Sequence, residues 1–312
     1  MRVLYSYLRT HFTAHFQWRV YGSVAAFVGA LIAFNYATNF ERTVIQTRSF
    51  AGQWALFFCL HAASYFGVVA LVAWHTTRTA FLTHRSFWVK SLVGLAMLCA
   101  YRAFPYAVLV PAEVPRGAFS LALMLAKHSV GWLAAALVLL ALYAAFDRRS
   151  GGDWYGLTLH NANLRPYAGL FAVVALLACG ASFFPSFLRA YPRYSSTQGT
   201  LLAAALEWPD WSPLWGFELT YLSTFIFVEL FFRGFLVLGM DKHLGRDAVL
   251  PMAATYAVFH FGRPMGETIG SAIGACVLGA IALESRNIWG GILVHMTLAL
   301  AMELFAHLQK VI

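Results

Sequence analysis

The sequence predicts an all-helical protein, folded as a polytopic bundle of about eight to nine transmembrane helices. Of its 312 residues, 60% are hydrophobic and only 11% are charged, and the mean hydropathy is +0.66. Soluble domains carry about 25% charged residues, so this composition indicates a chain that lies in a bilayer. The apolar residues also gather into runs close to the roughly 20 residues that a spanning helix needs.

About nine such runs follow one another along the chain. They lie near residues 20–38, 51–74, 88–110, 118–146, 167–188, 214–239, 247–262, 266–283 and 287–308. The seventh and eighth runs are short and are separated only by Gly262-Arg-Pro264, so they form either a tight pair or two full spans. The basic, aromatic segment before the first run is not expected to be a removable signal peptide, because that run is long enough to remain as a span.

The net charge of +9 reflects orientation in the membrane, and no nucleic-acid partner is expected. Lys and Arg gather on alternate loops, which places those loops and the N-terminus on the cytoplasmic side by the positive-inside rule. Arg102 and Lys127 lie inside or beside apolar runs. We expect them to extend to the membrane surface, or otherwise to line a substrate groove or bind lipid headgroups.

The composition changes at Asp147–Asn163, where Arg148-Arg-Ser-Gly-Gly-Asp153 is typical of a loop. This break divides the chain into an N-terminal region of four spans, residues 1–150, and a C-terminal region, residues 151–312. Only the second region contains clustered ionisable residues within its apolar runs. We therefore expect the functional site there.

Four ionisable residues lie in the middle of these C-terminal runs: Glu229, Arg233, His260 and His295. A charged side chain at bilayer depth costs at least about 2.5–3.5 kcal/mol on insertion scales. Glu229 and Arg233 are four residues apart, so they share a helix face and can pair, which alone would account for both. Glu218 lies about three turns earlier and points to the same face.

Depth favours a chemical role for these residues. Counted from the predicted cytoplasmic ends, Glu229, His260 and His295 lie at a similar depth, about 12–20 Å at 1.5 Å per residue. A carboxylate or neutral imidazole can take a proton from water, and a second imidazole can donate to a developing oxyanion. No metal or other cofactor is expected, since HExxH is absent, although two histidines and a carboxylate remain able to hold zinc.

Three stretches then resemble the family of CAAX-processing and bacteriocin-immunity proteins (CPBP, also called Abi), which are intramembrane endopeptidases. The family motifs are Glu-Glu-x-x-x-Arg, Phe-x-x-x-His and His-x-x-x-Asn. Here they correspond in order to the stretches that begin at Val228, Tyr256 and His295, and the resemblance covers about residues 154–308. It implies that glutamate activates water with His260, and that His295 and an asparagine stabilise the oxyanion.

The sequence departs from this pattern in two places. Val228 replaces the first motif glutamate, and Ala299 replaces the asparagine. His260-Phe-Gly-Arg-Pro-Met-Gly-Glu267 looks like a variant of some bacterial members, in which Arg263 precedes proline. Glu267 is therefore either a substitute base or a charge at a helix start, where the helix dipole favours it. Glu303, eight residues after His295, either replaces the asparagine or lies in the interface.

The leading interpretation is an integral-membrane endopeptidase of a bacterial inner membrane, which hydrolyses a peptide bond in or near a membrane-associated segment. Its expected catalytic residues are Glu229, Arg233, His260, His295 and Glu267, supported by Glu218, Tyr256, Arg263 and Glu303. Val228 and Ala299 instead favour a catalytically silent scaffold or regulator of the same family. A transporter could also use such residues at the midplane, but no inverted repeat is visible.

Overall fold

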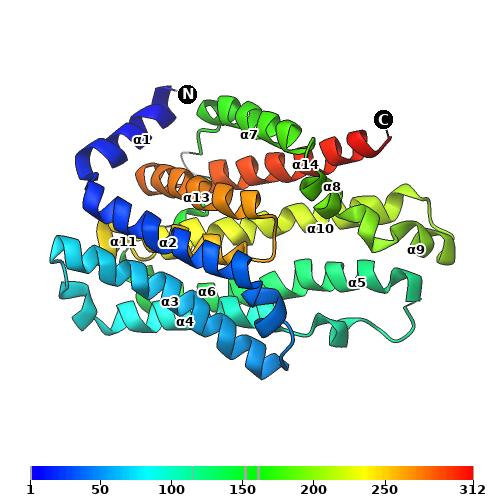
Figure 1. Ribbon diagram of the computed structural model, residues 1–312, viewed down its shortest axis with the longest axis horizontal. Helices are drawn as coiled ribbons and strands as arrows, with labels where there is room; N and C mark the ends of the chain where they lie inside the picture. Colours follow the sequence, from blue (N-terminus) through cyan, green and yellow to red (C-terminus); the bar gives the residue numbers. More distant parts are fainter. Residues whose placement is uncertain (1, 115, 151–152, 160–161, 312) are drawn as a thin grey trace. The chain divides into compact units, whose positions relative to one another are not determined.

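The computed structural model describes residues 2–114, 116–150, 153–159 and 162–311, which form helices and connecting turns without a β-strand (Figure 1). The α-helices are α1 (Arg2–His15), α2 (Trp18–Thr38), α3 (Phe50–Thr76), α4 (Arg85–Ala103), α5 (Phe119–Ala126), α6 (Trp132–Phe146), α7 (Ala168–Ala181), α8 (Pro185–Ala190), α9 (Gly199–Ala205), α10 (Trp211–Glu229), α11 (Asp241–Leu244), α12 (Val249–Phe259), α13 (Met265–Ser285) and α14 (Trp289–Val311).

Shorter helical turns connect these elements. The π-helical segments are η1 (Glu41–Ile45), η5 (Lys127–Gly131) and η10 (Leu230–Leu238). The 3₁₀ turns are η2 (Ala80–Thr83), η3 (Tyr106–Leu109), η4 (Arg116–Ala118), η6 (Arg148–Ser150), η7 (Trp154–Gly156), η8 (Arg165–Tyr167), η9 (Tyr194–Thr197) and η11 (Gly245–Ala248).

The predicted class, an all-helical integral membrane protein, is confirmed for the described residues, but the count of eight to nine spans is not. Among the described residues, six helical stretches are long and apolar enough to cross a membrane, and a pair bent by 97°, Arg165–Ala181 with Pro185–Ala205, would make seven. The runs predicted at 214–239 and 247–262 lie in one helical stretch, Trp211–Phe259. The run predicted at 88–110 corresponds to α4, which contains Lys90 and Arg102 and is not among the six.

The chain forms two compact units, each assembled from three separate segments. Unit 1 comprises Met1–Phe104, Leu137–Pro166 and Glu229–Trp289, and unit 2 comprises Pro105–Ala136, Tyr167–Val228 and Gly290–Ile312. The division at residue 150 drawn from the sequence stays a prediction.

In unit 1, α12 is the central helix and packs against α2, α3, α13 and η10. Its residues from Val249 to Val258 are all buried. A stripe along α2 at every fourth residue (Val20, Val24, Val28 and Ile32) joins Val68 and Val72 of α3 and the apolar side of α12 in one core cluster. Residues four apart share a helix face, so this stripe sets the side of α2 that packs inward.

Two apolar clusters of described residues lie within unit 2. Leu121 of α5, Phe217 and Tyr221 of α10, and Ala299 of α14 form the first. The second consists of Phe187 of α8, Tyr191 directly after α8, and Ala306 of α14. Together these clusters fix the unit 2 part of α14, which carries His295 and Glu303.

Candidate active site

The predicted pairing of Glu229 with Arg233 is confirmed. Glu229 ends α10, Arg233 lies in η10, and both side chains are fully buried with Arg233 Nη1 3.0 Å from Glu229 Oε1. The backbone around them has widened from α- to π-geometry, and the segment ends with Gly239 N–H donating to the carbonyl of Gly234 five residues earlier, at 2.8 Å. Such π-helical segments are rare and often occur at functional sites.

Tyr256 of α12 connects this ion pair to His260. The Arg233 guanidinium lies over the Tyr256 ring, 4.5 Å from its centre. The Tyr256 ring also meets the His260 imidazole edge to face, with 4.4 Å between ring centres. Glu229, Arg233, Tyr256 and His260 therefore form one continuous set of side chains in unit 1, from two separate helices.

The His260 ring has a defined hydrogen-bonding pattern. His260 follows the last residue of α12, and its Nδ1 lies 2.9 Å from the carbonyl oxygen of Tyr256. A carbonyl only accepts hydrogen bonds, so Nδ1 carries the proton. In the neutral imidazole Nε2 is then the unprotonated nitrogen, the one able to accept a proton from water.

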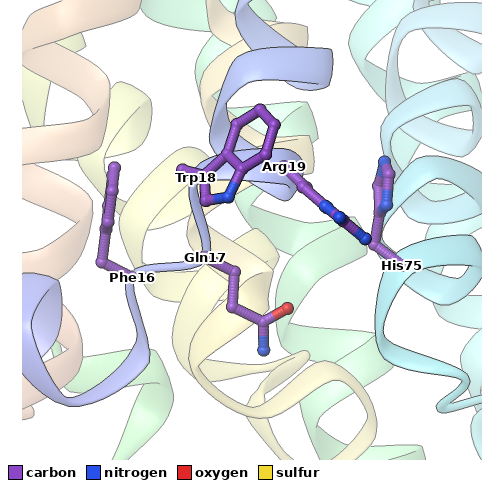
Figure 2. A pocket seen from close by; sticks show the side chains of 5 residues that line it. All are labelled: Phe16, Gln17, Trp18, Arg19 and His75. Carbon is purple, nitrogen blue, oxygen red and sulfur yellow. The ribbon is translucent and has the colours of Figure 1, made fainter.

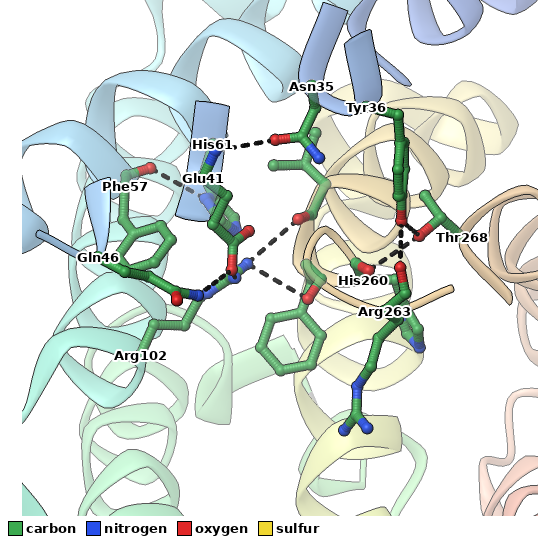
Figure 3. Close-up of polar contacts among 12 residues, drawn as sticks. Asn35, Tyr36, Glu41, Gln46, Phe57, His61, Arg102, His260, Arg263 and Thr268 are labelled. Atoms are coloured by element: carbon green, nitrogen blue, oxygen red, sulfur yellow. Dashed lines mark hydrogen bonds and ion pairs between the residues drawn. The ribbon is translucent and has the colours of Figure 1, made fainter. Parts of the chain in front are cut away.

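The loop after His260 is fastened at both ends. Thr268 Oγ1 donates to the carbonyl of His260 at 2.8 Å, and Tyr36 Oη of α2 donates to the carbonyl of Arg263 at 2.6 Å (Figure 3). Gly262, with φ +84°, makes the turn between them. Glu267 lies in the first turn of α13, as predicted, and both it and Arg263 are half-buried.

The remaining predicted site residues lie in unit 2. His295 is buried, and its ring stacks on Phe225 with 5.6 Å between ring centres. Glu303 accepts hydrogen bonds from the backbone N–H of Arg193, at 2.8 and 2.9 Å, and of Tyr194, at 3.3 Å. Its carboxylate therefore anchors the start of η9. Glu218 is half-buried, and its Oε2 has no hydrogen-bond partner among the described residues.

The residues at the two family departures are both buried and hydrophobic. Val228 is 6% exposed, and Ala299 is 3% exposed within the cluster of Leu121, Phe217 and Tyr221. Neither position offers a hydrogen-bonding side chain. The structure thus groups Glu229, Arg233, Tyr256 and His260, whereas the placement of His295 opposite them, and the roles of Glu267 and Glu303, stay predictions.

The described residues contain no group of three or more His, Cys, Asp or Glu side chains close enough together to hold a metal ion. A surface pocket of about 440 Å³ lies elsewhere in unit 1, at the junction of α1 and α2 (Figure 2). Phe16, Gln17, Trp18, Arg19 and His75 line it, and none of them belongs to the candidate site.

Sequence reasoning missed a second buried ion pair near His260. Arg102 Nη2 of α4 lies 2.7 Å from Glu41 Oε1 of η1, and both side chains are less than a tenth exposed (Figure 3). The prediction that Arg102 extends to the membrane surface is therefore wrong, because a buried carboxylate from a neighbouring element holds it inside. The sequence feature that could have indicated this pair is the acidic residue Glu41, which lies between two apolar runs.

The chain therefore has the features of an integral membrane protein with a polar site inside its apolar part. The site consists of the buried Glu229–Arg233 ion pair and the oriented His260, carried by helices of membrane-spanning length. Residues 210–301 match the family model described as type II CAAX prenyl endopeptidase Rce1-like. This match agrees with the predicted resemblance to the CPBP family, and the matched residues include the positions of all three motifs. No curated protein and no solved structure gives a significant match.

Proposed function

We propose that this chain is an intramembrane endopeptidase that hydrolyses a peptide bond next to a membrane-associated segment. The observation that carries the proposal is the continuous set Glu229–Arg233–Tyr256–His260, which presents a histidine with a basic Nε2 within the matched segment. The family description favours a substrate with a prenylated C-terminal cysteine motif.

In this mechanism His260 Nε2, assisted by Glu229 or Glu267, takes a proton from a water molecule. The water oxygen attacks the carbonyl carbon of the scissile bond, and a hydrogen bond from His295 stabilises the resulting oxyanion. When the intermediate collapses, the C–N bond breaks and the proton passes to the leaving amine. Arg233 holds the Glu229 carboxylate in place through their buried ion pair.

One observation favours a second function, that of a silent family member which binds membrane proteins without cutting them. Val228 and Ala299 are packed as ordinary core residues and offer no group in place of the family's glutamate and asparagine. A scaffold would depend on its surface and would keep its partners when the histidines are removed.

The deciding experiment uses purified full-length protein in liposomes, with a peptide ending in a Cys-aliphatic-aliphatic-X motif, prenylated or not. Products are identified by mass spectrometry, with and without a chelator to test for a metal. We expect His260→Ala and His295→Ala to lose at least about 100-fold in rate, as removal of acid–base groups does. His75→Ala, altered at the distant pocket, should retain the rate.

Cleavage that survives both histidine substitutions would overturn the assignment. Absence of cleavage by the wild type, together with unchanged partners in a pull-down of the double histidine variant, would establish the scaffold instead. Loss of cleavage on chelation would replace the metal-independent mechanism with a zinc-dependent one.

A further inference from the structure

The carboxyl end of α12, immediately before His260, is held by residues that lie outside the matched segment. The last four carbonyls of an α-helix lack partners within the helix. In α12, Arg102 Nη1 donates to two of them, those of Val258 at 3.1 Å and Phe259 at 3.3 Å (Figure 3). A cation is also electrostatically favourable at a helix carboxyl end.

Arg102 is itself tightly constrained. Its Nη2 donates to Glu41 Oε1, and its guanidinium lies 4.3 Å from the centre of the Phe57 ring. Glu41 in turn accepts from Gln46 Nε2 at 3.1 Å, and its backbone N–H donates to Asn35 Oδ1 at 3.0 Å. A planar guanidinium that bridges a carboxylate and two carbonyls has little freedom to move.

The same carboxylate faces the loop that follows His260. A Cβ placed on Gly262 would come within 3.1 Å of Glu41 Oε1, so the turn passes directly against the ion pair. Arg102 and Glu41 therefore contact the chain on both sides of His260, at Val258 and Phe259 before it and at Gly262 after it. The hydrogen bond from His260 Nδ1 to the Tyr256 carbonyl lies within the same last turn of α12.

We propose that Arg102, fixed by Glu41, is a positioning residue that sets the orientation and tautomer of His260. The proposal rests on the proposed role of His260 in catalysis. It also gives residues of the N-terminal region, which lie outside the family match, a role in positioning the active-site histidine. Without the guanidinium, the carbonyl of Phe259 loses the hydrogen bond from Arg102 and that of Val258 keeps only the one from the Phe261 N–H, at 3.1 Å, so the last turn of α12 is held less firmly.

The test compares Arg102→Gln, Arg102→Lys and Glu41→Gln with Arg246→Gln as matched control. Arg246 pairs with Glu284 in the same unit, but it contacts neither α12's carboxyl end nor His260. We expect Arg102→Gln to lower kcat by about 10–100-fold with little change in KM, the cost of a displacement of about 1 Å. Arg102→Lys should recover part of this loss, and Arg246→Gln should leave kcat unchanged.

A second readout is independent of cleavage. In protein labelled with ¹⁵N-histidine, the His260 signals, assigned by comparison with His260→Ala, report which ring nitrogen carries the proton. We expect the Nδ1–H tautomer in the wild type and a mixture in Arg102→Gln. An unchanged tautomer with a lower kcat would overturn the positioning role. If no variant cleaves any substrate but the tautomer still shifts, the proposed function fails and the positioning role stands.

Discussion

Glu229 and Arg233 are the most deeply buried opposite charges in the candidate site, with no exposed side-chain surface on either. Removing one partner of such a pair leaves an uncompensated buried charge, which costs about 3–5 kcal/mol. We therefore expect Arg233→Met alone to be strongly destabilising. Glu229→Gln is expected to be less damaging, because the amide can still accept a hydrogen bond.

Replacing both partners separates stability from chemistry. Glu229→Leu combined with Arg233→Met removes both charges and fills a similar volume, so most of the lost stability should return while cleavage stays absent. Thermal unfolding in detergent and the peptide assay measure the two properties side by side. A double variant as unstable as Arg233→Met would show that the pair is not the source of the loss.

At the scale of secondary-structure elements, Asp147, which follows the last residue of α6, connects this helix to α4, α11 and η7. Its carboxylate accepts from Lys90 Nζ of α4 at 2.7 Å, Lys242 Nζ of α11 at 2.6 Å and Tyr155 Oη of η7 at 2.9 Å. Burial by itself raises the pKa of Asp147, but these hydrogen bonds outweigh it and hold the pKa below its usual value. The cluster thus ties the chain after α6 to α4 and α11.

This shift predicts how stability depends on pH. An aspartate with a lowered folded pKa contributes stability above its unfolded value of about 3.9, and that contribution is lost as pH falls through the folded pKa. Near pH 7, Asp147→Asn should cost about 1.5–3 kcal/mol, as expected for hydrogen bonds to charged groups. The difference in unfolding free energy between variant and wild type should shrink as the pH falls from 7 toward and below the lowered folded pKa of Asp147. A constant difference would exclude the carboxylate charge as its cause.

The sequence predicted interactions between residues close together in the chain better than interactions between residues far apart in it. Glu229 with Arg233, and Glu267 at a helix start, follow from helical spacing and were predicted correctly. Arg102 was placed wrongly because its partners, Glu41 and the carbonyls of Val258 and Phe259, come from other elements. The span count was not confirmed for a related reason, since hydropathy runs do not show that 214–239 and 247–262 share one helical stretch.

At the scale of the whole molecule, some helices of the matched segment 210–301 pack against helices that lie outside that segment. In unit 1, α12 is buried against α2 and α3 as well as against α13 and η10. The core cluster of Val24, Val68 and Ala254 joins all three helices of that interface. The site residue His260 therefore depends on helices that precede the family segment by more than a hundred residues.

This dependence predicts the behaviour of a divided chain. Residues 1–150 and 151–312, expressed separately, should each fail to give stable protein, because each leaves one side of the unit 1 core exposed. Co-expressed, the two fragments should associate through α2, α3 and α12 and recover cleavage, since Arg148 and Arg149 before the break and Asp153 after it are exposed, and breaks at exposed positions are tolerated. Co-purification by a tag on one fragment, followed by the peptide assay, measures both. Cleavage by residues 151–312 alone would show that the C-terminal region carries the whole active site and would also contradict the positioning role of Arg102.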